Sequence, residues 1–132
     1  MNIYIQVEVS SRELDSKLLL ATLAAARGHQ VIVSSVREIL SGIKRGILPP
    51  GIFHTKSLSP GIEKIARHQS IIDTGSMITS IDEEGGLIDH GYDRFARARY
   101  SEKSIGQSSA VFGWGSEDVD TLKRIYSKHV FY

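Results

Sequence analysis

The sequence has no cysteine, only three prolines and almost no excess charge of either sign. Without cysteine the chain has neither a disulfide framework nor a thiolate for catalysis or metal binding. Sixteen basic and 15 acidic residues give a net charge of +1 with neutral histidines, so composition provides no broad basic surface for nucleic acid. The five histidines show neither helical pairing nor a His-x-His spacing, and we therefore expect no metal site.

Long hydrophobic runs are also lacking. The longest apolar stretch, residues 18–26, is interrupted by Thr22 and is too short to cross a bilayer. Residues 1–9 carry no basic segment, and Gln6 and Glu8 interrupt their apolar positions, which is typical of a strand and not of a signal peptide. We therefore expect a cytoplasmic protein. With 132 residues, 41% of them hydrophobic, the chain is sufficient for one globular domain.

The first third of the chain has the pattern of a strand–helix–strand unit. Residues 3–9 alternate between apolar and polar side chains, which predicts a strand. Ser10 and Glu13 have the spacing of a capping box, so a helix should begin at Ser10 and end at Gly28 in a left-handed conformation. The residues expected to face inward on this helix are Leu14, Leu18, Leu19, Leu23 and Ala26. Residues 31–33 predict a short strand that is buried on both faces.

The middle of the chain is harder to assign. Residues 36–44 predict a second helix, with Ile39, Leu40 and Ile43 inward. Ser59 followed by Pro60 has the chemistry of an N-cap and first helical residue, so a third helix should begin there. Residues 70–73 and 77–81 are both strand candidates, and one of them should provide the next strand of the sheet.

The last third predicts a strand over residues 110–112 and a helix capped by Ser116. Residues 129–132 have the pattern of a further strand that stops soon after it begins, so we expect the chain to be a truncated piece of a longer protein. Strands alternate with helices throughout, which predicts an α/β fold: a Rossmann-like, mainly parallel sheet with helices on both faces, in a single domain over residues 1–132.

An acidic segment directly follows the strand candidate at residues 77–81. It consists of Asp82, Glu83 and Glu84, followed by Gly85 and Gly86. Open α/β sheets bind ligands at the carboxyl ends of their strands. Adjacent carboxylates repel one another, which raises the pKa of at least one of them toward the range of a general acid or base. Two glycines would allow a ligand to approach the backbone. The alternative interpretation is a solvated acidic turn.

His90 and Arg94 lie just beyond this segment. His90 stands between two carboxylates and is a candidate acid or base, although a loop histidine without a chemical role is the alternative. Arg94 lies close to Arg97 and Arg99 in the sequence, and the three arginines are candidate ligands for a phosphate or a sugar carboxylate, or else part of a charged helix face.

Two further turns should lie at the same edge of the sheet. Ser10, Ser11 and Arg12 follow the first strand at a helix N-terminus, which favours anions. Trp114, between two glycines, follows the strand at residues 110–112; it is either a stacking surface for a sugar ring or an anchor in the core, and the core anchor is the safer interpretation. No Gly-x-Gly-x-x-Gly fingerprint follows the first strand, so we expect no dinucleotide cofactor.

Several of these segments resemble the surface carbohydrate biosynthesis proteins of bacteria. The similar segments are residues 7–9, 12–15, 18–21, 27–29, 82–85, Tyr100 and 111–115. The resemblance covers nearly the whole chain, and its most specific parts are the acidic segment and the Gly-Trp-Gly segment.

The resemblance implies a glycosyltransferase-like protein of the GT-B class, which has two Rossmann-like domains that face one another. This chain would be the acceptor-side half, with Glu84, helped by Glu83 or Asp82, as the base toward an acceptor hydroxyl. The nucleotide-activated sugar would bind mainly to a second domain beyond Tyr132, so this chain alone should be inactive. Peripheral membrane contact and self-association stay open. The alternatives are a non-catalytic Rossmann-like binding module and a sugar-nucleotide epimerase-like enzyme.

Overall fold

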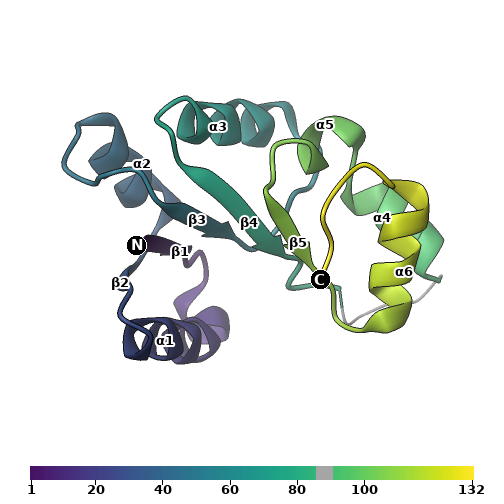
Figure 1. Cartoon of the computed structure of the whole chain (residues 1–132), viewed down its shortest axis with the longest axis horizontal. Coiled ribbons are helices and arrows are strands. Elements are labelled where there is room, and N and C mark those ends of the chain that lie inside the picture. Colours follow the sequence, from purple (N-terminus) through teal and green to yellow (C-terminus); the bar gives the residue numbers. More distant parts are fainter. Residues whose placement is uncertain (86–90) are drawn as a thin grey trace. The chain divides into compact units, whose positions relative to one another are not determined.

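The computed structural model describes residues 1–85 and 91–132. The chain forms a five-stranded parallel sheet in the order β2-β1-β3-β4-β5, flanked by helices (Figure 1), which confirms the predicted α/β, Rossmann-like fold. The elements are, in chain order, β1 (Asn2–Gln6), α1 (Ser10–Ala26), β2 (Gln30–Ser34), α2 (Val36–Lys44), β3 (Ile52–Thr55), α3 (Ile62–Ile72), β4 (Met77–Ile81), α4 (Tyr92–Arg99), α5 (Glu102–Ile105), β5 (Ala110–Phe112) and α6 (Ser116–Ile125). Two compact units are present: residues 1–54 with 71–77, and residues 55–70 with 78–132.

The first unit is built on β1, which pairs in parallel with both β2 and β3. Its core contains the fully or almost fully buried side chains of Tyr4, Ile5, Ile39, Ile43 and Phe53. Helix α2 has the bounds expected from the sequence. Its two buried isoleucines are one turn apart and therefore lie on the same face of the helix. Figure 1 shows α1 and α2 on opposite sides of β1.

Helix α1 is oriented differently from the prediction. Its buried residues are Glu13 and Lys17, whereas the five leucines of the helix are between 37% and 62% exposed, so the expected inward leucine face is wrong. The Glu13 carboxylate accepts the backbone N–H of Glu8 at 2.8 Å, which ties the sheet-facing side of the helix to the turn before it. Ser10 does not cap the helix; Val9 is the N-cap residue. The helix ends as predicted, with Gly28 at a φ of +82°.

Strand β2 is an edge strand, because it comes first in the sheet order β2-β1-β3-β4-β5. Ile32 at its centre is 39% exposed, so the prediction that this strand is buried on both faces is wrong. An edge strand has a neighbour on one side only, and less of its surface is covered.

The second unit is built on β4 and β5, which pair in parallel. Of the two strand candidates, residues 77–81 form β4, whereas residues 70–72 are the last turn of α3 and Asp73 lies in the turn that follows. The isoleucine pair in this stretch resembles a strand, but Ile71 is completely buried as part of the helix. Helix α3 begins at Ile62, and the expected start at Ser59 and Pro60 is wrong by two residues.

Helices α4 and α6 lie side by side in the second unit, where Asp93 and Arg124 form an exposed ion pair (Figure 1). Gly115 is the N-cap residue of α6, so Ser116 is the first helical residue and not the cap. The last residues extend the sheet locally: Val111 forms a parallel bridge with Phe131.

Candidate functional site

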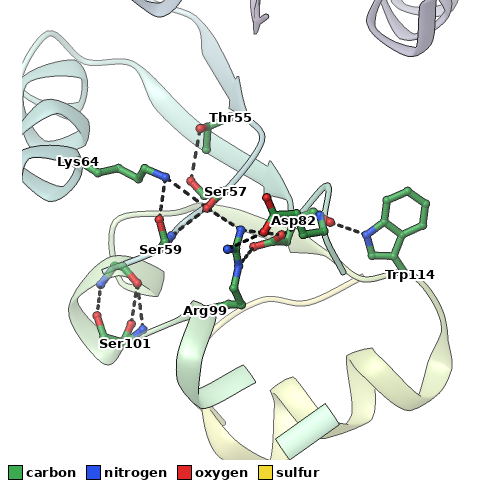
Figure 2. Close-up of polar contacts among 10 residues, drawn as sticks. Thr55, Ser57, Ser59, Lys64, Asp82, Arg99, Ser101 and Trp114 are labelled. Atoms are coloured by element: carbon green, nitrogen blue, oxygen red, sulfur yellow. Dashed lines mark hydrogen bonds and ion pairs between the residues drawn. The ribbon is translucent and has the colours of Figure 1, made fainter. Parts of the chain in front are cut away.

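Asp82 is the first residue after β4, and it is buried in the second unit, with 1% of the residue exposed. Arg99, the last residue of α4, donates from Nε and Nη2 to the two oxygens of this carboxylate at 2.9 and 3.0 Å (Figure 2). Such a two-point, charge-assisted contact is among the stronger hydrogen-bonding arrangements in proteins. Asp82 is therefore one half of a buried ion pair, which holds α4 against the end of β4.

The Arg99 guanidinium is itself partly buried, and its side chain is one quarter exposed. Burial alone would lower the pKa of Arg99, but the hydrogen bonds and charge of Asp82 and the charge of Glu84 raise it above its ordinary value. The Nη1 atom of Arg99 lies 2.9 Å from the Glu84 carboxylate. One cation therefore compensates two of the three acidic side chains of this turn.

The three carboxylates occupy different environments. Asp82 is buried, Glu83 is half-buried and Glu84 is exposed. The backbone N–H of Glu84 donates to the Asp82 carboxylate at 3.0 Å, and that of Glu83 donates to the Lys56 carbonyl at 3.2 Å. Glu84 is thus the acidic side chain of this turn that a ligand in solvent can reach most easily.

The acidic turn and the Gly-Trp-Gly turn meet at one atom, the backbone carbonyl oxygen of Asp82. This oxygen accepts the N–H of Gly85 at 3.0 Å and also the indole N–H of Trp114 (Figure 2). A Cβ atom on Gly85 would collide with the Trp114 indole, so glycine is the residue that allows this contact. The structure therefore brings together two of the three segments that we expected at one sheet edge, the acidic segment and the Gly-Trp-Gly segment.

Trp114 itself is 55% exposed, so its interpretation as a core anchor is wrong. Its backbone N–H donates to the Asp118 carboxylate at 3.1 Å, which fixes the turn before α6. Burial raises the pKa of Asp118, the Trp114 N–H lowers it, and the charge of Asp82 adds to the rise, so that the net direction is upward. An amphipathic ring that is held at its N–H and exposed beyond it has the form of a stacking surface.

A group of hydrogen-bond donors next to Asp82 was not predicted from the sequence. Ser57 and Ser59 lie between β3 and α3, and Lys64 lies in the first turn of α3. The Lys64 ammonium contacts Ser59 Oγ at 2.7 Å and Ser57 Oγ at 3.3 Å, and Arg99 Nη2 lies 3.5 Å from Ser57 Oγ (Figure 2). We call Ser57, Ser59, Lys64 and Arg99 the donor cluster. The sequence feature that could have indicated the donor cluster is the stretch Ser-x-Ser-Pro-Gly, which precedes a helix that contains a lysine.

The remaining predicted site residues belong to other elements or lie outside the described residues. Ser10, Ser11 and Arg12 are exposed in the first turn of α1, in the first unit. Arg94 is exposed on α4. Gly86 and His90 lie outside the described residues.

Residues 1–85 and 91–132, which the structure describes, contain no group of three or more His, Asp or Glu side chains that could hold a metal ion. No helix within them is both long enough and apolar enough to cross a membrane.

Known proteins provide no further guide to this site. Comparisons of the chain with protein-family models, with curated proteins and with solved structures found no match.

Proposed function

We propose that this chain is the acceptor-side domain of a glycosyltransferase-like protein of bacterial surface polysaccharide synthesis, and that its acceptor saccharide binds at the acidic turn and Trp114. One observation carries the proposal. The two most specific segments of the resemblance, the acidic segment and the Gly-Trp-Gly segment, contact each other through the Asp82 carbonyl and the Trp114 indole. Segments that are about 30 residues apart in sequence thus contribute to one surface.

In this proposal, the role of each residue follows from the exposure and the charge of its side chain. The exposed Trp114 ring stacks on the apolar face of a sugar, because an indole combines a large apolar surface with a polar edge. Glu84 accepts a hydrogen bond from a sugar hydroxyl and acts as the base that activates it. Arg99 keeps the Glu84 carboxylate close to the turn. Asp82, which was a candidate base, holds Arg99 instead.

The remaining parts of this proposal, which concern the sugar donor and the location of the protein, rest on the resemblance alone. The nucleotide-activated sugar binds mainly to a second domain, so the chain binds such donors very weakly and does not transfer a sugar by itself. A cytoplasmic location belongs to the same proposal.

A non-catalytic saccharide-binding module is the second candidate. It is favoured by the ion pair between Asp82 and Arg99, because this pair occupies one of the candidate bases. Of the three carboxylates of the turn, Glu84 is then the exposed one. The two candidates share the binding site and differ in turnover, so saccharide binding tests what they have in common.

Replacement of Trp114 by alanine should weaken saccharide binding by about tenfold or more, because one aromatic contact contributes on the order of 1 kcal/mol beyond the area that it buries. Trp114→Phe should lose less, since it retains a ring. The measurement is calorimetric or NMR titration of the chain with neutral and N-acetylated mono- and disaccharides.

Glu84→Gln should also weaken binding, and Glu102→Gln provides the matched control. Glu102 is an exposed glutamate on α5 that contacts His129 and lies outside the acidic turn. Equal affinity of the wild type and Trp114→Ala for every saccharide that binds would contradict the proposed site. So would a panel in which no saccharide shifts the signals of Gly85 or Trp114.

A further inference from the structure

We propose that the outer edge of β2 is a dimer interface, at which two copies of this chain pair their β2 strands antiparallel across a two-fold axis. Strand β2 lies at the end of the sheet order, and among the described residues its only neighbouring strand is β1. An edge strand presents a row of unpaired backbone N–H and C=O groups, which a strand of another chain can use. The inference does not depend on the proposed function.

The backbone hydrogen bonds of β2 show which of its residues are directed toward β1. The Gln30 N–H donates to the Met1 carbonyl at 3.0 Å, and the Ser34 carbonyl accepts the Val7 N–H at 2.9 Å. Successive residues of a strand direct their backbone groups to opposite sides of that strand. Gln30, Ile32 and Ser34 therefore all point toward β1.

Val31 and Val33 have the opposite orientation, and their N–H and C=O groups point to the open edge of the sheet. The two valines are placed symmetrically about Ile32. A second copy in antiparallel orientation therefore offers an acceptor to each donor: Val31 of one copy exchanges N–H···O bonds in both directions with Val33 of the other, and the two-fold axis repeats this pair. The edge is thus complementary to itself.

The side chains of β2 also suit a second copy of the same strand. Residues 30–34 carry no charge, so identical strands meet without repulsion. Ile32, which is 39% exposed, lies opposite itself at the axis, and Gln30 lies opposite Ser34. Edge strands that stay single are usually protected by charged residues, proline or a bulge. Strand β2 has neither charge nor proline, and its pairing with β1 is continuous over residues 30–34.

Helix α1 adds apolar surface at the same edge, because it packs on β1 and β2 (Figure 1). A two-fold axis perpendicular to the sheet places the α1 helices of both copies on the same face, antiparallel to one another. The five leucines of α1 are between 37% and 62% exposed, and those on the flank toward β2 become covered in the dimer.

The area of this surface sets the expected strength of the dimer. The leucines and Ile32 together expose about 300 Å² of apolar side chain, at roughly 100 Å² for each fully exposed side chain. A standard interface buries about 800 Å² on each partner. Since the leucines and one edge strand provide less than that, we expect a reversible dimer that dissociates at micromolar concentrations, and not an obligate one.

Sedimentation velocity of the chain across the micromolar range tests the inference, and the mass should rise from that of one chain to that of two. Hydrogen exchange locates the contact. The Val31 and Val33 amides should exchange more slowly as the concentration rises, whereas the Ile32 amide, which is already directed toward β1, should change much less. A chain that stays monomeric overturns the inference, and so does a dimer that leaves the two valine amides unprotected.

Val33→Pro is the variant that acts on the edge alone. Proline removes an N–H group that points outward, so half of the hydrogen bonds across the axis are lost and none within the sheet. The dissociation constant of the dimer should therefore rise by about tenfold or more, while the circular dichroism of the monomer stays unchanged. A folded Val33→Pro chain that dimerises as the wild type does contradicts the pairing.

Ile32→Lys and Ile32→Glu are the second pair of variants, for use if Val33→Pro does not fold. Each places two like charges opposite one another at the axis, and each should weaken the dimer by about tenfold. An equimolar mixture of the two should dimerise more tightly than either variant alone, because unlike charges then face one another. No gain on mixing would show that Ile32 does not meet its own copy, and would overturn the inference.

Ile62→Lys is the matched control for these charge variants. Ile62 is 87% exposed and is the first residue of α3, in the second unit. The substitution should change the dissociation constant by less than about twofold. Equal weakening of the dimer by Ile62→Lys and Ile32→Lys would show that added charge acts from any position, and would overturn the assignment to β2.

Discussion

Replacement of Asp82 by alanine should lower the free energy of unfolding by about 3 kcal/mol, because it leaves a partly buried guanidinium without its main partner. The variant loses both hydrogen bonds from Arg99 and the acceptor for the Glu84 N–H. Loss of one partner of a buried ion pair costs about 3–5 kcal/mol. We expect the lower end of that range, since one quarter of the Arg99 side chain is exposed and water can hydrate part of it.

Two variants make this measurement specific. Asp82→Asn keeps the volume and one acceptor oxygen, so it should destabilise the chain less than alanine does. Asp93→Ala breaks the exposed ion pair with Arg124, whose side chains are both more than half exposed, and should cost less than about 1 kcal/mol. Chemical denaturation gives all three values. A loss in Asp82→Ala no larger than that in Asp93→Ala would show that the buried pair does not stabilise the fold.

Acidification should destabilise the chain steeply between pH 6.5 and about 4. Burial lowers the pKa of both His54 and His68 to about 4, with a further contribution from Lys17 to the first and from Lys64 and Arg67 to the second. In this window the unfolded chain binds both protons while the folded chain does not, so stability falls as the pH falls. Each histidine contributes about 1.4 kcal/mol per pH unit at the steepest point, and the two together about 2.7.

Thermal or denaturant unfolding at half-unit pH steps from 7.5 to 4 measures this slope. The raised pKa of Asp118 acts in the opposite direction near the acidic end, because the folded chain then holds that proton more tightly. His54→Gln and His68→Gln should each remove about half of the slope, whatever they do to stability at pH 7.5. A wild-type stability that stays flat from pH 6.5 to 4.5 would contradict the prediction.

The sequence was informative where a short pattern and the sheet topology agree. Residues 77–81 have the composition of a strand, and an acidic, glycine-containing turn follows them, so β4 and the position of Asp82 at its end were predictable. The approach of Trp114 to that turn followed from the rule that parallel strands share an edge. The partner of Asp82 was not predictable, because Arg99 comes from a different element 17 residues away and its neighbours Arg94 and Arg97 have similar sequence surroundings.

The prediction for α1 failed for a physical reason. Leucines at helical spacing usually mark the buried face of a helix, but the sheet-facing positions of α1 are Glu13 and Lys17. The hydrogen bond from the Glu8 N–H to the Glu13 carboxylate is consistent with this orientation of the helix, and no periodicity of apolar residues encodes it. The donor cluster was missed in a similar way, because Ser57 and Ser59 are adjacent to Arg99 only after α4 has folded against the end of β4.

Trp114 is the only tryptophan in the sequence. Since its indole is half exposed and bound to the Asp82 carbonyl, the tryptophan fluorescence of this protein reports on the environment of the acidic turn and not on the buried core. A change in emission on adding a ligand therefore identifies occupancy at this turn without any label. By the same reasoning, emission that changes before circular dichroism does during denaturation would indicate local opening of residues 82–85 and 114, and not global unfolding.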